Sequence, residues 1–279
     1  VACVLYLALG QLALGGGACY GRAAIDATSE DTEVAATVPC ALFGALFAQS
    51  VVQCAVARAR PAKGRVAEAA AWPCAGVQAL TLLYYVVERS DAACLVNAPP
   101  FLANISSVTA RPLHLVLWTC SVSAQVLAIY SVERELSARM PRPPPSNARR
   151  DCCAALVAVQ VMCWCSALLD ARAPGATGYG LALAALSCAA FYALLAKGVR
   201  GPLARGAAAA RRGKDERIAA QLERAAVFFT VAWHGFPLVW GAGVLGVVGD
   251  ARVRLGYVLC DVVAKFLPAS IYVSLAVDP

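Results

Sequence analysis

The chain has 279 residues, of which 60% are hydrophobic and 15% are charged, and its mean hydropathy is +0.65. Soluble proteins carry about 45–50% apolar and about 25% charged residues, so this composition excludes an ordinary soluble domain and indicates a helical membrane protein. The net charge of +7 does not indicate nucleic-acid binding, because 17 of the 24 Lys and Arg residues lie in three short segments between apolar stretches. No soluble catalytic domain is evident, and we do not expect an enzyme.

Seven apolar stretches have about the length of 20 residues that a helix needs to cross a bilayer. They lie at 36–57, 67–88, 107–131, 152–170, 177–197, 222–247 and 254–276. We therefore predict an all-α membrane protein, with a seven-transmembrane-helix bundle over residues 36–279. Residues 1–35 form an apolar segment and a linker, and residues 1–15 belong either to an extra N-terminal helix or to a signal peptide. Because the chain begins with Val rather than Met, we expect a fragment of a longer protein.

Basic and acidic connections alternate along the chain. Lys and Arg cluster after the first, third and fifth stretches, and the last of these clusters lies in a predicted loop from Lys197 to Arg224. The positive-inside rule then predicts that the N-terminal side of the first helix is extracellular and the C-terminus cytoplasmic. We expect the plasma membrane as the location and the lipid bilayer as the partner, and the sequence leaves open whether two copies form a homodimer.

The 13 cysteines show no spacing typical of a zinc site, so we expect no bound metal. Most lie in apolar stretches, where a free cysteine behaves as a small hydrophobic residue. Cys19 and Cys94 lie in segments predicted to be extracellular, where a disulfide between them is compatible with the redox environment.

Lys265 lies in the middle of the last apolar stretch, one helical turn after Asp261. A charged side chain at membrane depth costs about 2.5–3.5 kcal/mol on insertion scales, so it needs a partner or a chemical use. The i, i+4 spacing places the two side chains on one helix face, where each offsets the desolvation of the other. A desolvated lysine also loses its proton more readily and can attack an aldehyde to form a Schiff base.

The sixth stretch carries aromatic residues around a proline. Trp233, Phe236, Pro237 and Trp240 share one helix face at i, i+3, i+4 and i+7. Pro237 removes a backbone hydrogen bond and bends the helix. Taken alone, this pattern is also typical of an ordinary aromatic core stripe, but together with Lys265 it favours a slot for a flat conjugated ligand.

The pattern W-x-x-[YF]-P-x-x-W in the sixth helix, followed by D-x-x-x-K in the seventh, resembles the microbial (type 1) rhodopsins. The resemblance covers residues 36–276 and implies all-trans retinal bound covalently to Lys265 as a protonated Schiff base, with Asp261 as a counterion. It also implies that Trp233, Phe236, Pro237 and Trp240 line the polyene, and that light isomerises the chromophore.

The third stretch favours one subfamily of the microbial rhodopsins. Thr119-Cys120 is similar to the T-C-P motif of the channelrhodopsins, with Ser121 in place of proline, so Cys120 is expected beside the retinal. In the fifth stretch, Ser187 or Cys188 is expected near the ring end of the retinal.

The departures from the family argue against an outward proton pump. Rhodopsin pumps carry a carboxylate one turn after an Arg in the third helix, whereas no Asp or Glu lies between Arg111 and Glu133. The carboxylate position falls on Leu115 or His114, depending on the direction of counting. His114 is either a hydrogen-bonded histidine at the outer end of the helix or a titratable group near the Schiff base. The aspartate that usually faces the third-helix cysteine is also missing, and the region holds Val159, Gln160 and Val161.

Two functions remain, with a third as a distant alternative. The second helix lacks the glutamate row of cation-conducting channelrhodopsins and carries Gln78 and Thr81 between Glu68 and Glu88. A light-gated channel with such a neutral lining and basic mouths would pass small anions rather than cations. Alternatively, the chain is the photosensory input domain of a larger signalling or fusion protein. The third alternative is a transporter or receptor that merely contains a buried Asp–Lys pair.

Overall fold

The fold is described from a computed structural model, which covers residues 29–58, 64–89, 112–140, 147–170, 177–244, 247–248, 252–253 and 255–265. All regular structure in these ranges is helical. The helices are α2 (Ser29–Arg58), α3 (Gly64–Arg89), α4 (Pro112–Ala138), α5 (Ala148–Asp170), α6 (Thr177–Leu194), the π-helix η3 (Leu195–Arg200), α7 (Gly201–Arg212), α8 (Glu216–Val244) and a final helical segment at 255–265. Because α6, η3 and α7 are continuous, the described part of the chain forms seven rods, which confirms the predicted seven-helix bundle.

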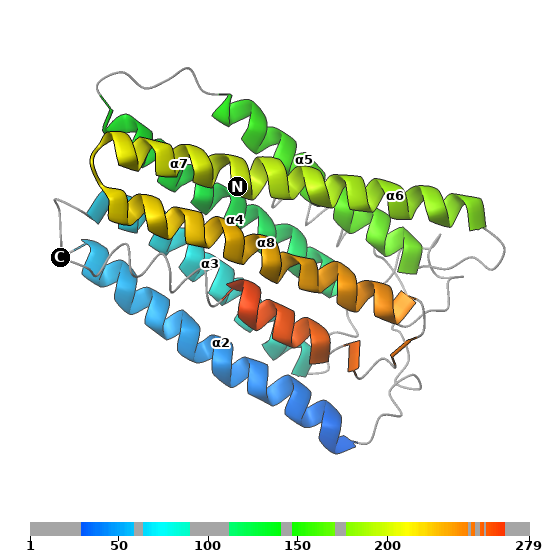
Figure 1. Cartoon of the computed structure of the whole chain (residues 1–279). Coiled ribbons are helices and arrows are strands. Elements are labelled where there is room, and N and C mark those ends of the chain that lie inside the picture. Colours follow the sequence, from blue (N-terminus) through cyan, green and yellow to red (C-terminus); the bar gives the residue numbers. More distant parts are fainter. Residues whose placement is uncertain are drawn as a thin grey trace.

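The rods lie side by side along one direction (Figure 1). Each of the helices from α2 to α6 packs on the next one along the chain, α7 packs on α8, and α4 contacts α3, α5 and α7. The final segment lies against α8, since a Cβ added at Gly235 would meet Cys260 Sγ at 2.8 Å. The final segment also hydrogen-bonds to α3. These contacts to α3 and α8 close the bundle around Lys265.

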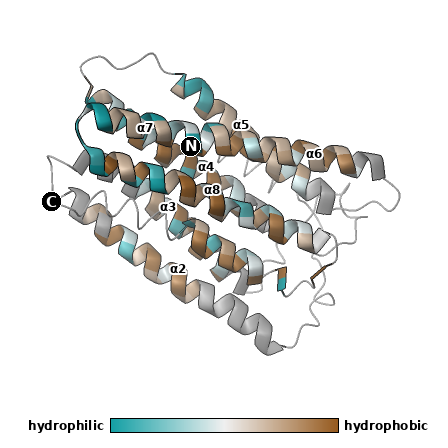
Figure 2. Ribbon diagram, viewed as in Figure 1, coloured by the Kyte–Doolittle hydropathy of each residue, from teal (hydrophilic) through white to brown (hydrophobic). Residues whose placement is uncertain are grey.

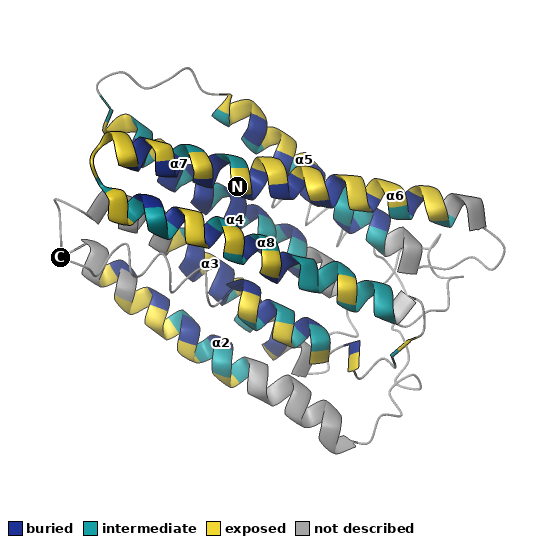
Figure 3. Cartoon of the chain, viewed as in Figure 1, coloured by how far each residue is buried: buried dark blue, intermediate teal, exposed yellow. Residues whose placement is uncertain are grey.

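Polar residues lie inside the bundle and large apolar residues cover its surface. Buried polar residues include Gln78, Thr81, Ser121 and Gln125, while Leu181 is 77% exposed and Leu238 72% exposed. Figure 3 shows exposed residues along the outer faces of α6 and α8, and Figure 2 shows hydrophilic residues gathered at the turn between α7 and α8. Soluble proteins bury their large aliphatic residues, so this distribution supports the predicted lipid environment.

Two described helices are long and apolar enough to cross a membrane, Gly180–Arg212 and Glu216–Ala242. The stretches Cys40–Val52 and Trp72–Leu83 are shorter apolar helices.

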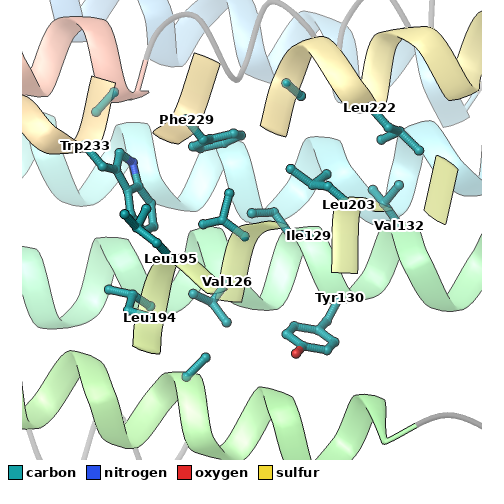
Figure 4. Packing of buried hydrophobic residues seen from close by; sticks show 14 of the residues in the cluster. Val126, Ile129, Tyr130, Val132, Leu194, Leu195, Leu203, Leu222, Phe229 and Trp233 are labelled. Atoms are coloured by element: carbon teal, nitrogen blue, oxygen red, sulfur yellow. The ribbon is translucent and has the colours of Figure 1, made fainter. Parts of the chain in front are cut away.

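The largest core cluster of the described residues is built mainly from aliphatic and aromatic side chains of the helices from α4 to α8. Val126, Ile129 and Val132 of α4 meet Leu194 and Leu195 at the α6–η3 junction, with Phe229 and Trp233 of α8 on the other side (Figure 4). Gly198 permits this close approach, because an added Cβ would lie 3.0 Å from Leu194 Cδ1 and 3.1 Å from Val126 Cγ2. The core therefore fixes α4 against the middle of the longest rod.

Several predicted boundaries were wrong. The first helix begins at Ser29 rather than at residue 36, and the predicted loop from Lys197 to Arg224 is largely helical, with a turn at 213–215. Alanines and arginines of 201–212 are good helix formers, and the apolar side of α7, including Leu203, Gly206 and Ala207, is buried. The basic residues of this segment therefore lie on the surface of a helix and not in a loop. Cys19, Cys94 and residues 1–28 lie outside the described residues.

Candidate functional site

The central feature is a buried ion pair in the final helical segment. Lys265 Nζ lies 2.6 Å from Asp261 Oδ1, and the two residues are 3% and 0% exposed. The spacing of four residues brings both side chains to one face, as the sequence predicts. An uncompensated buried charge is costly, so each of these groups stabilises the other inside the bundle.

A tyrosine of α3 also binds the carboxylate of Asp261. The hydroxyl of Tyr85 donates a hydrogen bond of 3.0 Å to Asp261 Oδ2, and its ring stacks on Phe43 of α2 with the ring centres 5.6 Å apart. The two carboxylate oxygens of Asp261 thus have different partners, Lys265 and Tyr85. Sequence reasoning did not assign Tyr85, because the adjacent Tyr84 and Tyr85 lie on different faces of a helix and nothing in the sequence shows which one faces the acid.

A second residue of α3 contacts the backbone at the lysine. Gln78 Nε2 donates a hydrogen bond of 2.8 Å to the carbonyl oxygen of Lys265, and Gln78 is 0% exposed. Gln78 and Tyr85 are seven residues apart, so they lie on the same face of α3 two turns from each other. One face of α3 therefore contacts both members of the ion pair.

The aromatic residues predicted to line the retinal lie on α8, the helix that packs against the final segment. Trp233 is buried in the same cluster as Ala264, the residue before Lys265. Phe236 meets the edge of Trp118 from α4, with the ring centres 5.1 Å apart. Pro237 lies inside α8 and Trp240 one turn further on.

Trp118 connects this cluster to the ion pair. Its ring packs edge-on against Tyr257 of the final segment at 5.1 Å, and it contacts the clusters that contain Trp233 and Tyr85. The sequence offered no motif for Tyr257. Trp118 of α4 therefore links α8 to the final segment.

Thr119 is fully buried in α4, and Cys120 next to it is partly buried. The expected place of Val159 to Val161 opposite Cys120 stays a prediction. Ser187 of α6 hydrogen-bonds Ser166 of α5 at 3.1 Å, so its expected place near the retinal ring stays a prediction. Arg111 and the side chains of Glu68, Glu88, His114 and Leu115 lie outside the described residues.

A second buried charged cluster lies at the opposite end of α4 from Trp118. Arg205 of α7 makes a two-point contact with Glu133 of α4 and also bonds Asp151 of α5 at 3.1 Å. Lys197 Nζ lies 3.1 Å from Asp151 Oδ1. The backbone carbonyl of Lys197 accepts a 2.7 Å hydrogen bond from the hydroxyl of Tyr130. This cluster joins α4, α5 and the η3–α7 rod, and sequence reasoning missed it because its members come from four separate places in the chain.

The chain matches no known protein-family profile, and no curated protein matches it significantly. Solved structures match it closely in shape. Halorhodopsin, a light-driven chloride pump, is 18% identical with a TM-score of 0.64, and the match covers 88% of this chain and 95% of that one. The bromide-bound form of halorhodopsin from Halobacterium salinarum is 19% identical with a TM-score of 0.65, and the match covers 88% and 92% of the two chains. A light-driven proton pump from Leptosphaeria maculans is 14% identical with a TM-score of 0.64, covering 88% and 95%.

The chain has the fold of the microbial rhodopsins. At these identities the likeness establishes the fold, and what the site does is argued from its own residues. In this rhodopsin fold, a buried amine and a buried acid lie side by side between α3 and α8, with aromatic rings around them.

Proposed function

We propose that the chain is a retinal-binding, light-activated membrane protein. The observation that carries this proposal is the Lys265–Asp261 pair, buried and 2.6 Å apart in a rhodopsin fold. Retinal, linked to Lys265 Nζ as a protonated Schiff base, would supply the visible absorption and the light-driven isomerisation. The solved neighbours are described as light-driven pumps, which is consistent with a light-activated role.

The residues present suit that group. Lys265 offers a primary amine shielded from water, which is the nucleophile that condensation with an aldehyde requires. Asp261 supplies a negative charge beside Nζ and thereby favours a positively charged nitrogen there. Tyr85 holds Asp261 by its second oxygen, so the acid stays in place when the amine reacts. Trp118, Phe236 and Trp233 provide apolar rings that would exclude water from a bound polyene.

The test is the visible spectrum of the purified protein after addition of all-trans retinal. The wild-type protein is expected to develop a visible band that is absent in free retinal. The Lys265→Ala variant is expected to remain without that band, whereas Lys197→Ala, whose side chain is 53% exposed, is expected to keep it. A wild-type protein that stays colourless, although folded and supplied with retinal, contradicts the proposal.

We further propose that light opens a path for small anions along the contact between α3 and α4. Tyr85 and Leu117 belong to one packed cluster, so one antiparallel turn further Thr81 comes level with Ser121, and Gln78 with Gln125. All four of these deeper residues are buried and uncharged, and the polar atoms Gln78 Oε1, Ser121 Oγ and Gln125 Oε1 have no hydrogen-bond partner among the described residues. A row of such polar groups can hydrogen-bond water or a conducted ion, which apolar side chains cannot do.

Patch clamp of retinal-supplied cells tests the channel. A photocurrent whose reversal potential follows the chloride gradient supports an anion path, and one that follows the cation gradient contradicts it. A current that persists unchanged without any driving gradient would indicate a pump instead. Pumping of protons is disfavoured because the sequence of α4 carries no Asp or Glu before Glu133.

The alternative function is a photosensory input domain without an ion path. Its support is the Glu133–Arg205–Asp151 cluster, which links α4, α5 and α7. A light-driven movement of these helices would act on this cluster. A normal visible band and photocycle, with no photocurrent at any voltage, would favour this alternative.

A further inference from the structure

The contact between Gln78 and Lys265 joins two helices that are 187 residues apart in sequence, and both residues are almost completely buried. The hydrogen bond of 2.8 Å goes to the backbone carbonyl of the lysine, so its role is independent of what the amine itself binds. A buried amide group hydrogen-bonded to a fixed backbone atom locates one helix relative to another.

The orientation of the Gln78 amide follows from its partner. A backbone carbonyl accepts hydrogen bonds and cannot donate them, so the amide nitrogen, and not its oxygen, must face Lys265.

Tyr85 and Gln78 act on the two members of the ion pair in different ways. Tyr85 binds the side chain of Asp261, whereas Gln78 binds the backbone of Lys265, and both project from one face of α3. The two contacts are about 10 Å apart along α3, and their partners are about 6 Å apart along the final helix. Together they restrain the rotation of the final helix about its own axis and its sliding along α3. The direction in which the Lys265 side chain leaves the backbone depends on that rotation.

We infer that Gln78 is a positioning residue for the Lys265 amine: its hydrogen bond to the Lys265 carbonyl sets the rotation of the final helix that aims Nζ at Asp261. This inference rests on the proposed reaction of Lys265 with retinal. Its consequence is that loss of the Gln78 amide slows the condensation of Lys265 with retinal, while the fold and the Asp261 side chain remain in place.

The contact itself can be tested without retinal. The chain has four lysines, Lys63, Lys197, Lys214 and Lys265, so lysine labelled with ¹³C at the carbonyl gives only four backbone signals in solid-state NMR. One signal is expected to shift in Gln78→Met, which keeps the size of the side chain and removes its donor. The matched control is Thr81→Val, since Thr81 is equally buried but bonds Val77 of its own helix. Unchanged lysine signals in Gln78→Met would overturn the inference.

The effect on the amine is measured as the rate at which retinal becomes attached to the protein. Samples are taken over time, trapped with borohydride and counted as covalent adduct across a range of pH. Gln78→Met is expected to react about five- to tenfold more slowly than wild type, as loss of one net hydrogen bond implies, with an altered pH profile. Thr81→Val is expected to react like wild type even if it unfolds at a lower temperature.

The outcomes separate the two proposals. If wild-type protein forms no adduct at all, the proposed retinal binding fails. If wild type and Gln78→Met form adduct at the same rate and with the same pH profile, retinal binding stands and Gln78 is only a packing residue. If Thr81→Val slows the reaction as much as Gln78→Met, the effect belongs to the general stability of α3, and the positioning role is overturned.

Discussion

The hydroxyl of Tyr85 donates a hydrogen bond to Asp261 across 176 residues of sequence, while Lys265 occupies the other oxygen of the same carboxylate. The acid is therefore held from two sides, by its own helix and by α3. This arrangement keeps a full negative charge inside an apolar bundle, where a hydrogen bond to a charged group contributes more than one between neutral groups.

Replacing Tyr85 by Phe removes one of these two supports. We expect Tyr85→Phe to lower the free energy of unfolding by about 1.5–3 kcal/mol, because a buried carboxylate oxygen loses a hydrogen bond. Denaturation of the protein in detergent by SDS measures the change. Tyr192→Phe is the matched control, since that tyrosine is 58% exposed, and its effect is expected to be small. Equal losses in the two variants would mean that the bond to Asp261 adds nothing to stability.

Removing the charge of Asp261 is expected to change the protonation of the pigment. In Asp261→Asn the positive nitrogen formed at Lys265 loses the negative charge beside it, so its proton is lost more readily. At neutral pH the visible band should give way to absorption in the near ultraviolet, and acidification should restore it. A pH titration of the spectrum checks this. Asp151→Asn, in the other charged cluster, should leave the titration unchanged.

The Glu133–Arg205 contact is expected to be the more important of the ion pairs near the α7 end. Glu133 is 3% exposed, and its replacement by Gln leaves the Arg205 guanidinium with one carboxylate in place of two. We expect Glu133→Gln to destabilise the protein by about 3 kcal/mol, as breaking a buried pair does. The control is Glu223→Gln, in the surface pair with Arg211, where no measurable change is expected.

A double-mutant cycle separates this pair from its surroundings. The losses in Glu133→Gln and Arg205→Gln should sum to more than the loss in the double variant, because both single changes break the same contact. Additive losses would show that the two side chains do not depend on each other.

Gly198 is expected to tolerate no side chain. A Cβ there would lie 3.2 Å from Ala155 Cβ and closer still to Leu194 and Val126, so Gly198→Ala should destabilise the bundle by about 1–3 kcal/mol. Gly241→Ala places its methyl group in open space within α8 and should be neutral or slightly stabilising, since alanine favours helix. Thermal unfolding of both variants compares a close helix contact with an open one.

The sequence predicted the bundle and the Lys265–Asp261 pair because both follow from local patterns: lengths of apolar stretches, and a spacing of one helical turn. It could not predict the contacts of Tyr85 and Gln78 with the final segment, because these contacts depend on the rotation of one helix against another. It placed a loop at 197–224 because clustered arginines resemble a connection, whereas a helix with alanines on its buried side accommodates them equally well.

The covalent site on the protein tests the central claim most directly. Protein incubated with all-trans retinal is reduced with borohydride, digested, and searched by mass spectrometry for the modified lysine among the four in the chain. We predict retinyl modification of Lys265, with little on the exposed Lys197 and Lys214. Modification confined to the exposed lysines, or an unmodified Lys265 peptide from fully folded protein, would contradict the account.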